Sequence, residues 1–345
     1  MELFLKIVSP IKSYDFNNFI HNLLLSLPAS ILIGIILFFI LGFIPKLKSK
    51  EYRIYIVFSL TIIISFTIAL YNLGVSFETL VAVYSEWLHL IVRWIHIIVG
   101  VAWIGTSFYF NWLDSRLERD DPNFKHLDGC LWSVHSGGFY RIEKLKGPPE
   151  QLPKVLHWFK WEAYSTWISG FVLLILVYYL NASTMMLGNG GIELSPLGSI
   201  FISILLLLGS WLLYDFTCRN SSEESQQTLV IIGFSIFVIM SYILTQIFGS
   251  RAAYIHVGAI IGTLMAANVF RVIIPAQKNL VNAAEKNKEP NLTLSLEAKN
   301  RSIHNNYFTL PVLFIMISSH FPFTYGASYN WLILIIISIA GILTR

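Results

Sequence analysis

Four ionisable side chains lie within one apolar stretch, YSEWLHLIVRWIHIIVGVAWIG, at residues 84–105. Their three- and four-residue spacing places them on a single helical stripe together with three uncharged neighbours. The stripe comprises Glu86, His89, Arg93, His96, Gly100, Trp103 and Ser107. Ionisable side chains are costly in an apolar segment and mark a functional site; a structural Glu86–Arg93 pair is the alternative. We therefore predict that the stripe faces the interior of a helix bundle.

The histidines of this stripe predict a haem site, because a neutral imidazole in apolar surroundings is a good ligand for haem iron. A b-type haem between helices needs two histidines at similar depth. His89 matches His256 in predicted depth, and His320 is nearby. His96 lies deeper and has no evident partner. The candidate iron ligands are thus His89, His96, His256 and His320. The sequence contains no C-x-x-C-H, so it encodes no covalently attached c-type haem.

A second group of polar and aromatic side chains falls at the opposite depth. Its candidate catalytic residues are His135, His157, Glu162 and His304. Its candidate substrate-binding residues are Trp132, Asn268, Arg271, Asn305 and Asn306, and Arg93 of the first stripe is added to them for its positive charge. Donors, acceptors and aromatic planes of this kind can hold a planar polar anion. The alternative is the ordinary belt of aromatic and basic residues at a membrane surface.

The composition predicts helices within a membrane to position both groups. Hydrophobic residues make up 55% of the chain and charged residues 13%, against about 25% charged in a typical soluble domain. Apolar runs long enough to cross a bilayer lie at 23–44, 54–72, 83–110, 162–180, 197–217, 228–248 and 252–274, with weaker runs at 307–320 and 330–343. We expect an all-α, polytopic bundle of eight or nine transmembrane helices, forming a single integral membrane domain over 1–345.

Basic residues gather in alternate loops, at 45–53, 111–161, 217–228 and 271–306. Such loops face the cytoplasm, which places the N-terminus outside. The basic pI of 8.9 therefore reflects loop charges and gives no reason to expect a nucleic-acid partner. Of the two long cytoplasmic loops, 111–161 is expected to form a short amphipathic element under the membrane. The other, 275–306, is expected to be partly mobile.

Five blocks of this sequence together resemble the N-terminal membrane domain of the bacterial membrane-bound urate oxidases, also called urate hydroxylases. The blocks are RWIHIIVGVAWIGTSFYFNWLD, LWSVHSGGFYRIEKL, LHWFKWEAYSTWISGF, RAAYIHVGAIIGTLMAANVFRVIIPAQ and HNNYFTLPVLFIMISSHFP. The resemblance runs from about residue 20 to the end of the sequence.

This resemblance implies oxidation of urate to 5-hydroxyisourate, with electrons delivered to a c-type cytochrome. We expect the electrons to pass through haem held by the histidines named above, in the bacterial inner membrane. Family members commonly carry a C-terminal cytochrome c domain. This sequence ends at GILTR without a haem-attachment motif, so we expect either that a separate c-type cytochrome accepts the electrons or that the protein is a truncated or repurposed relative.

Two other functions remain open at this point. One is a haem-binding membrane redox protein with another substrate. The other is a transporter or copper-handling protein, because buried ionisable residues also mark ion pathways. The six methionines are scattered and do not form a copper-binding ladder.

Overall fold

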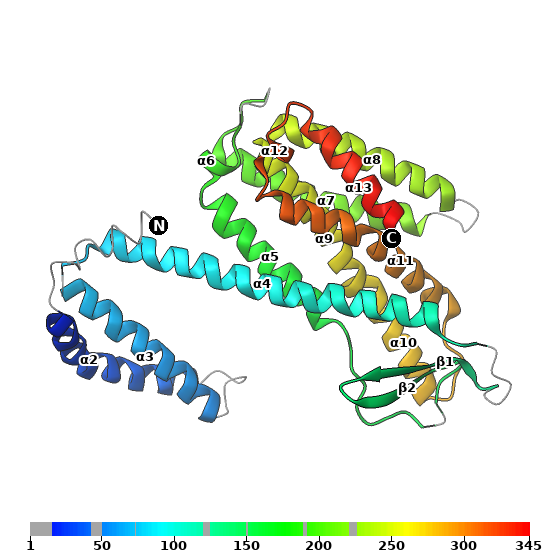
Figure 1. The fold of residues 1–345 in the computed structure, drawn as a ribbon, viewed down its shortest axis with the longest axis horizontal. Helices are drawn as coiled ribbons and strands as arrows, with labels where there is room; N and C mark the ends of the chain where they lie inside the picture. Colours follow the sequence, from blue (N-terminus) through cyan, green and yellow to red (C-terminus); the bar gives the residue numbers. More distant parts are fainter. Residues whose placement is uncertain are drawn as a thin grey trace. The chain divides into compact units, whose positions relative to one another are not determined.

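The computed structural model describes residues 16–42, 50–72, 74–119, 125–149, 151–188, 192–220 and 226–345. These residues are predominantly helical, which confirms the all-α prediction, with one two-stranded sheet (Figure 1). The chain divides at Leu90, within helix α4, into two compact units that are described separately. The first unit contains α2 (Phe16–Gly42), α3 (Lys50–Asn72) and the beginning of α4 (Phe77–Arg116).

The second unit contains the rest of α4 and all later elements. These are β1 (Leu127–His135), β2 (Gly138–Leu145), α5 (Trp161–Leu174), the π-helical turn η2 (Ile175–Tyr179), α6 (Ala182–Met185), α7 (Pro196–Arg219), α8 (Gln226–Ile247), α9 (Ser250–Asn268), the π-helical turn η4 (Val269–Ile273), α10 (Ile274–Glu285), α11 (Leu292–Ser318), α12 (Pro322–Tyr325) and α13 (Asn330–Thr344).

Seven helices of the described residues are long and apolar enough to cross a membrane, and they coincide with the seven strong runs predicted from the sequence. The two weaker runs also correspond to helices. The run 307–320 falls mostly within α11, and 330–343 is α13, whose 15 residues are apolar but shorter than the others. A total of eight or nine crossings stays a prediction.

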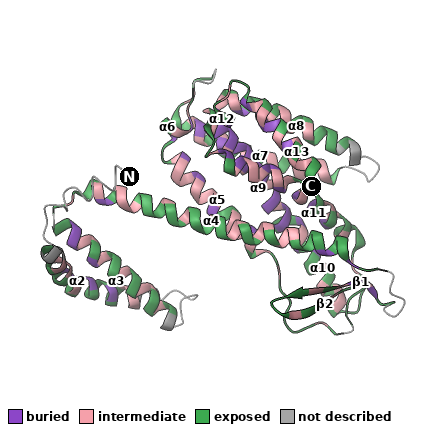
Figure 2. Ribbon diagram, viewed as in Figure 1, coloured by how far each residue is buried: buried purple, intermediate pink, exposed green. Residues whose placement is uncertain are grey.

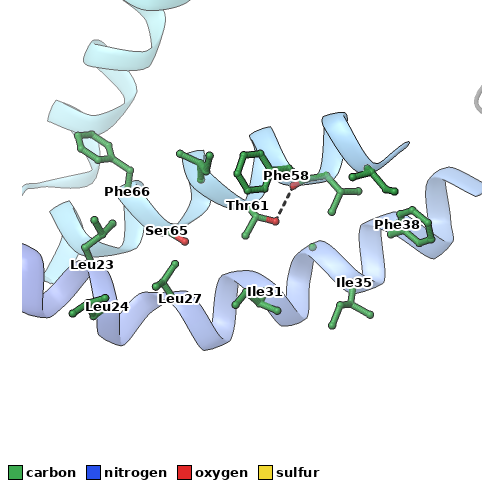
Figure 3. A pocket seen from close by; sticks show the side chains of 14 residues that line it. Leu23, Leu24, Leu27, Ile31, Ile35, Phe38, Phe58, Thr61, Ser65 and Phe66 are labelled. Carbon is green, nitrogen blue, oxygen red and sulfur yellow. Dashed lines mark hydrogen bonds between the residues drawn. The ribbon is translucent and has the colours of Figure 1, made fainter. Parts of the chain in front are cut away.

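In the first unit, small residues allow α2 and α3 to pack closely. Ser26 of α2 is buried and donates its hydroxyl proton to the carbonyl of Ser65 on α3, at 2.9 Å. Gly34 packs against Thr61, with no room for a Cβ atom between them. Figure 3 shows the apolar cavity that the two helices line, with a volume of about 780 Å³.

In the second unit, the core is built around α9, where the buried residues are concentrated (Figure 2). Small side chains let its neighbours approach: Ala252 and Ala253 are fully buried, and Gly258 contacts Ile315 of α11. Helix α9 also packs against α5, α7 and α8. Because hydrophobic burial does not drive association between helices within lipid, small residues and side-chain hydrogen bonds must hold such helices together.

The π-helical turn η4 ends directly before Ile274 and Pro275, at the start of α10. Proline has no backbone N–H, and its ring clashes with the carbonyl four residues earlier in a regular helix. A wider turn before Pro275 relieves that clash, so the chain continues from α9 into α10 without a loop.

The structure corrects the expectation of a long mobile loop at 275–306. Most of this segment belongs to α10 and α11. The Asn291 side chain accepts hydrogen bonds from the backbone N–H groups of Thr293 and Leu294, so it caps the start of α11. The other long loop, 111–161, was expected to form a short amphipathic element under the membrane. The structure places the β1–β2 hairpin there. Which side of the membrane each loop faces stays a prediction.

Candidate functional site

A buried arginine lies at the centre of a polar network between α7, α9 and α11. Arg301 of α11 is 1% exposed. Its Nη2 atom lies 2.8 Å from Oδ1 of Asp215 on α7, and its guanidinium carbon lies 4.9 Å from the centre of the Tyr214 ring. A buried charge is tolerated when it is paired and hydrogen-bonded. Asp215 and the Tyr214 ring meet this requirement for Arg301.

Three amide and hydroxyl groups extend the network from Arg301 to a histidine. Arg301 Nη1 donates to Oδ1 of Asn268 on α9, at 3.4 Å. Asn268 Nδ2 lies 3.0 Å from the Tyr214 hydroxyl and 2.9 Å from Oδ1 of Asn305. The Tyr214 hydroxyl is 2.8 Å from Nδ1 of His304, and Asn305 Nδ2 donates to the Met265 carbonyl at 3.0 Å.

Arg301 determines the orientation of the Asn268 amide, because a guanidinium can only donate. Asn268 Oδ1 is the acceptor, so Asn268 Nδ2 donates to the Tyr214 hydroxyl. The hydroxyl keeps its own proton and can donate it to His304 Nδ1 when that imidazole carries its proton on Nε2.

His304 is also kept uncharged by its surroundings. Burial, and then the positive charge of Arg301, lower the pKa of His304 to about 4. His304 precedes the predicted run 307–320, at the polar end of α11. At neutral pH it is thus a neutral imidazole.

The network balances its own charges. Arg219 pairs with Asp215 at 2.9 Å, and Glu297 lies 3.8 Å from Arg301. Two guanidinium groups therefore face two carboxylates. The network therefore carries little net charge.

A second acid–base pair forms at the start of α5. His157 Nε2 lies 3.6 Å from Oε1 of Glu162, and the His157 ring packs edge-on against Phe159. His157 is mostly exposed, whereas Oε2 of Glu162 is buried and has no hydrogen-bond partner among the described residues. A carboxylate beside an exposed imidazole can orient the ring and stabilise its protonated form. The pair can therefore take up a proton from a ligand or from solvent.

In the second unit, the stripe of α4 is half-buried from His96 to Ser107, whereas Arg93 is exposed, so the inward orientation predicted for the whole stripe is wrong for Arg93. His96 Nδ1 lies 3.1 Å from the Thr166 carbonyl and 3.0 Å from the Ser169 hydroxyl, both on α5. A Cβ atom at Gly170 would come within 3.0 Å of the His96 ring, so the glycine makes room for the imidazole. Further along the stripe, Trp103 packs against the core.

His96 has the anchoring that an iron-binding histidine needs. Such a ligand generally donates its second ring N–H to a carbonyl or carboxylate, and the Thr166 carbonyl can accept from His96 Nδ1. His96 therefore fits an axial haem ligand through Nε2.

His256 does not fit an iron ligand as it lies. It is fully buried, its Nδ1 is 2.7 Å from the Ala252 carbonyl, and its Nε2 is 2.8 Å from the Ser203 hydroxyl. Its ring also stacks on Phe248, with centroids 4.4 Å apart. Both nitrogens are occupied, so coordination would require Ser203 to release Nε2. The pairing of His256 with His89, which belongs to the first unit, stays a prediction.

The remaining predicted residues do not join the network. Asn306 accepts hydrogen bonds from Asn111 and Arg345. Trp132 and His135 are exposed on the β1–β2 hairpin, and Arg93, Arg271 and His320 are exposed on or beside helices. Of the residues predicted to form one cluster, the structure brings together Asn268, His304 and Asn305, and separately His157 and Glu162. The described residues contain no group of three or more His, Cys, Asp or Glu side chains that could hold a metal ion.

The sequence interpretation missed Arg301, Asp215 and Tyr214. Arg301 was counted among the loop charges because the helix before residue 307 was not expected. Asp215 could have been found, since it is a carboxylate within the apolar run at 197–217 and such residues mark functional sites. The four-residue spacing of Arg301 and Asn305 also places them on one face of a helix.

Comparison with known proteins identifies the region that carries the network. The family model described as urate oxidase N-terminal matches residues 82–345. The match includes α5, α7, α9 and α11 and excludes α2 and α3. No curated protein and no solved structure matches the chain.

Proposed function

Because the chain belongs to the urate oxidase N-terminal family, which indicates a urate-related oxidoreductase, we propose that it oxidises urate to 5-hydroxyisourate. We propose further that a separate c-type cytochrome accepts the electrons. The reaction adds the oxygen of one water molecule to urate and releases two electrons and two protons. The protein must therefore bind a planar heterocycle, accept protons and hand electrons to an acceptor.

The observation that carries this proposal is the network around Asn268 and Arg301, which lies within the residues that the family model matches. Urate presents alternating N–H and C=O groups around a flat ring. Asn268 uses both Nδ2 protons on Tyr214 and Asn305 and its oxygen on Arg301, so it holds the network in place. The hydrogen-bonding groups that remain for a ligand are the second Nδ2 proton of Asn305 and Nε2 of His304. A buried, directional set of this kind orients a planar ligand by its edges.

Proton removal is assigned to the His157–Glu162 pair. His157 is exposed, so it can exchange protons with solvent, and Glu162 stabilises its protonated form. Arg271, which is exposed and close in sequence to Asn268, supplies the positive charge that attracts anionic urate. This assignment gives the neutral network the task of orientation and the exposed groups the tasks of attraction and proton transfer.

A b-type haem remains part of the proposal only through His96. Haem would supply a one-electron path from the substrate to the acceptor. His96 would hold the iron through Nε2, whereas both ring nitrogens of His256 are already hydrogen-bonded. A reduced-minus-oxidised spectrum of the purified chain tests for the cofactor. Loss of the haem absorbance in His96→Ala, with retention in His256→Ala, is the expected result.

The decisive experiment measures urate-dependent reduction of added cytochrome c by membranes that contain the chain. A parallel assay uses ferricyanide as an artificial electron acceptor. It detects urate oxidation even where the added cytochrome c is not the natural acceptor. Asn268→Ala is expected to lower the rate about 100-fold, the size of effect seen when one well-placed polar group is removed.

Asn220→Ala is the matched control, because Asn220 is exposed at the end of α7 and, among the described residues, its side chain bonds to its own helix. It should leave the rate unchanged. Equal rates in Asn268→Ala and the parent chain, or no urate-dependent reduction of either acceptor, would contradict the proposal.

A transport function is the second candidate, and the charge-balanced Arg301–Asp215 pair favours it. Paired charges inside a helix bundle also mark substrate and ion pathways. In that case, vesicles containing the chain would accumulate labelled urate and return it chemically unchanged. Conversion of the label to 5-hydroxyisourate without accumulation would favour the oxidoreductase.

A further inference from the structure

The β1–β2 hairpin has a rigid turn and two distinct faces. Its strands pair in antiparallel register and are joined at Ser136 and Gly137, which both have positive φ, of 50° and 76°. Positive φ at both turn positions is typical of a type I′ turn, whose twist matches that of the strands. Residues directly opposite each other then share a face of the sheet. The hairpin is therefore a firm support for the side chains near its tip.

One face of the tip is apolar and uncovered by the described residues. Val134 lies opposite Phe139, and Trp132 lies opposite Arg141. Val134, Phe139 and Trp132 are 69%, 81% and 61% exposed. At the base of the same face, Cys130 is buried and its backbone pairs with Glu118. The exposure is thus confined to the tip.

Charged residues fix the base of the hairpin to the end of α4. Lys144 of β2 lies 2.6 Å from Asp114 of α4 and 3.1 Å from Asp128 of β1. Arg119 bridges the same two carboxylates, at 3.4 Å and 3.0 Å. Because α4 is one of the helices long enough to cross a membrane, the hairpin begins where that helix leaves the apolar region.

Residues 125–146 carry four lysine or arginine side chains and two carboxylates, and Arg141 pairs with Glu143 at 2.9 Å. Arg141 lies 5.7 Å from the Trp132 ring. Lys125 and Lys146 meet at the base, where Lys146 donates to the Lys125 carbonyl. Aromatic side chains beside lysine and arginine are the residues that settle at lipid headgroups, and basic residues are attracted to anionic lipids.

We propose that the tip of this hairpin inserts into the headgroup region of the bilayer that the chain's own helices cross. Trp132, Val134 and Phe139 contact lipid, and the neighbouring basic residues contact anionic headgroups. The hairpin would then be a second, interfacial anchor beside the helices. This inference does not depend on the proposed function.

The test places an environment-sensitive fluorophore on Phe139→Cys in the full chain, reconstituted in nanodiscs. Cys218→Ser removes the accessible thiol, and Cys130 is buried; the parent with Cys218→Ser alone gives the background. The matched control carries the same label on Tyr140→Cys, one residue away on the opposite face of the hairpin.

The label on Phe139→Cys should be blue-shifted and quenched at least twofold more strongly by a headgroup-proximal lipid nitroxide than the label on Tyr140→Cys. Quenching should be stronger in discs with anionic lipid than in zwitterionic discs. Equal quenching at both sites would overturn the proposal. Shielding of Phe139→Cys from aqueous iodide without lipid quenching would also overturn it, because a second copy or another protein would then cover the face.

Discussion

The α2–α3 pair and the α7–α9–α11 bundle use two different ways of holding apolar helices together. In the pair, Ser26, Gly34 and Ser65 bring the two backbones close, and apolar side chains line the cavity beside them. In the bundle, the buried Arg301 and Asp215 connect three helices through side-chain hydrogen bonds. Small residues suffice for packing within lipid, whereas a buried ion pair brings a large desolvation penalty and is weak evidence for stability.

This difference indicates which region carries chemistry. The family model matches the bundle and not the pair. A network that costs free energy to bury is retained where its polar groups have a task beyond packing. The α2–α3 contacts are those of close helix packing, whereas the bundle also holds buried polar groups that packing alone does not require.

The largest effect is expected from Asp215→Asn, which leaves the buried Arg301 without its nearest counter-charge. Removing one partner of a buried pair costs about 3–5 kcal/mol of unfolding free energy. Thermal or denaturant unfolding in one detergent measures it. The control is Asp114→Asn in the exposed hairpin cluster, where an exposed pair contributes about 1 kcal/mol or less. Equal losses of unfolding free energy in Asp215→Asn and Asp114→Asn would contradict the prediction that the buried pair contributes more than the surface pair.

Acid pH should weaken the bundle through His304. Its pKa in the folded protein is about 4, against about 6.5 in the unfolded chain. Between these values the unfolded chain binds more protons, so stability is full above about pH 6.5 and falls as the pH is lowered towards 4. The loss at pH 5 is about 2 kcal/mol.

Unfolding temperatures measured from pH 8 to pH 5 test this prediction. His304→Gln keeps an acceptor for the Tyr214 hydroxyl but cannot titrate, so its pH dependence should be flatter than that of the parent. An unchanged slope in this variant would show that other groups cause the acid sensitivity.

Two glycines one turn apart on α9 should respond in opposite directions to alanine. A Cβ atom at Gly258 would lie 2.7 Å from Ile315 Cγ2, so Gly258→Ala should cost about 1–2 kcal/mol through overpacking. Gly262 has open space within 4 Å, so Gly262→Ala should stabilise the helix by up to about 1 kcal/mol. Unfolding in the same detergent compares them. A destabilised Gly262→Ala would mean that another group approaches this face.

The smallest effect is expected in the first unit. Ser26→Ala removes the hydrogen bond to the Ser65 carbonyl while keeping the small side chain. Hydrogen bonds between membrane helices contribute about 0.6 kcal/mol on average. Protection of the α3 backbone amides from hydrogen exchange in micelles would report the change. A loss as large as that of Asp215→Asn would mean that the pair depends on polar contacts after all.

The sequence was sufficient to predict the helices but not the grouping of the site. Apolar runs located the strong spans because length and hydropathy are local properties. Asn268, His304 and Asn305 were predicted as one group, and they meet because α9 packs along α11, where Asn268 bonds to Asn305. Arg301 was missed because a charged residue before a weak apolar run looks like a loop residue. The separation of His157 from His304 depends on side-chain direction, which spacing alone does not give.

The π-helical turn before Pro275 determines the angular position of everything that follows it. A π-helical turn takes up about one residue more than an α-helical turn. Regular α-helix over Val269–Ile273, with no residue removed, would therefore turn α10 by about 100° about its axis and shift it by about 1.5 Å. The start of α11 would move with it, and Arg301 would leave the side of the bundle where Asp215 and Asn268 lie. The single wide turn η4 thus sets the angle between α9 and α10, and with it the position of Arg301 relative to Asp215 and Asn268.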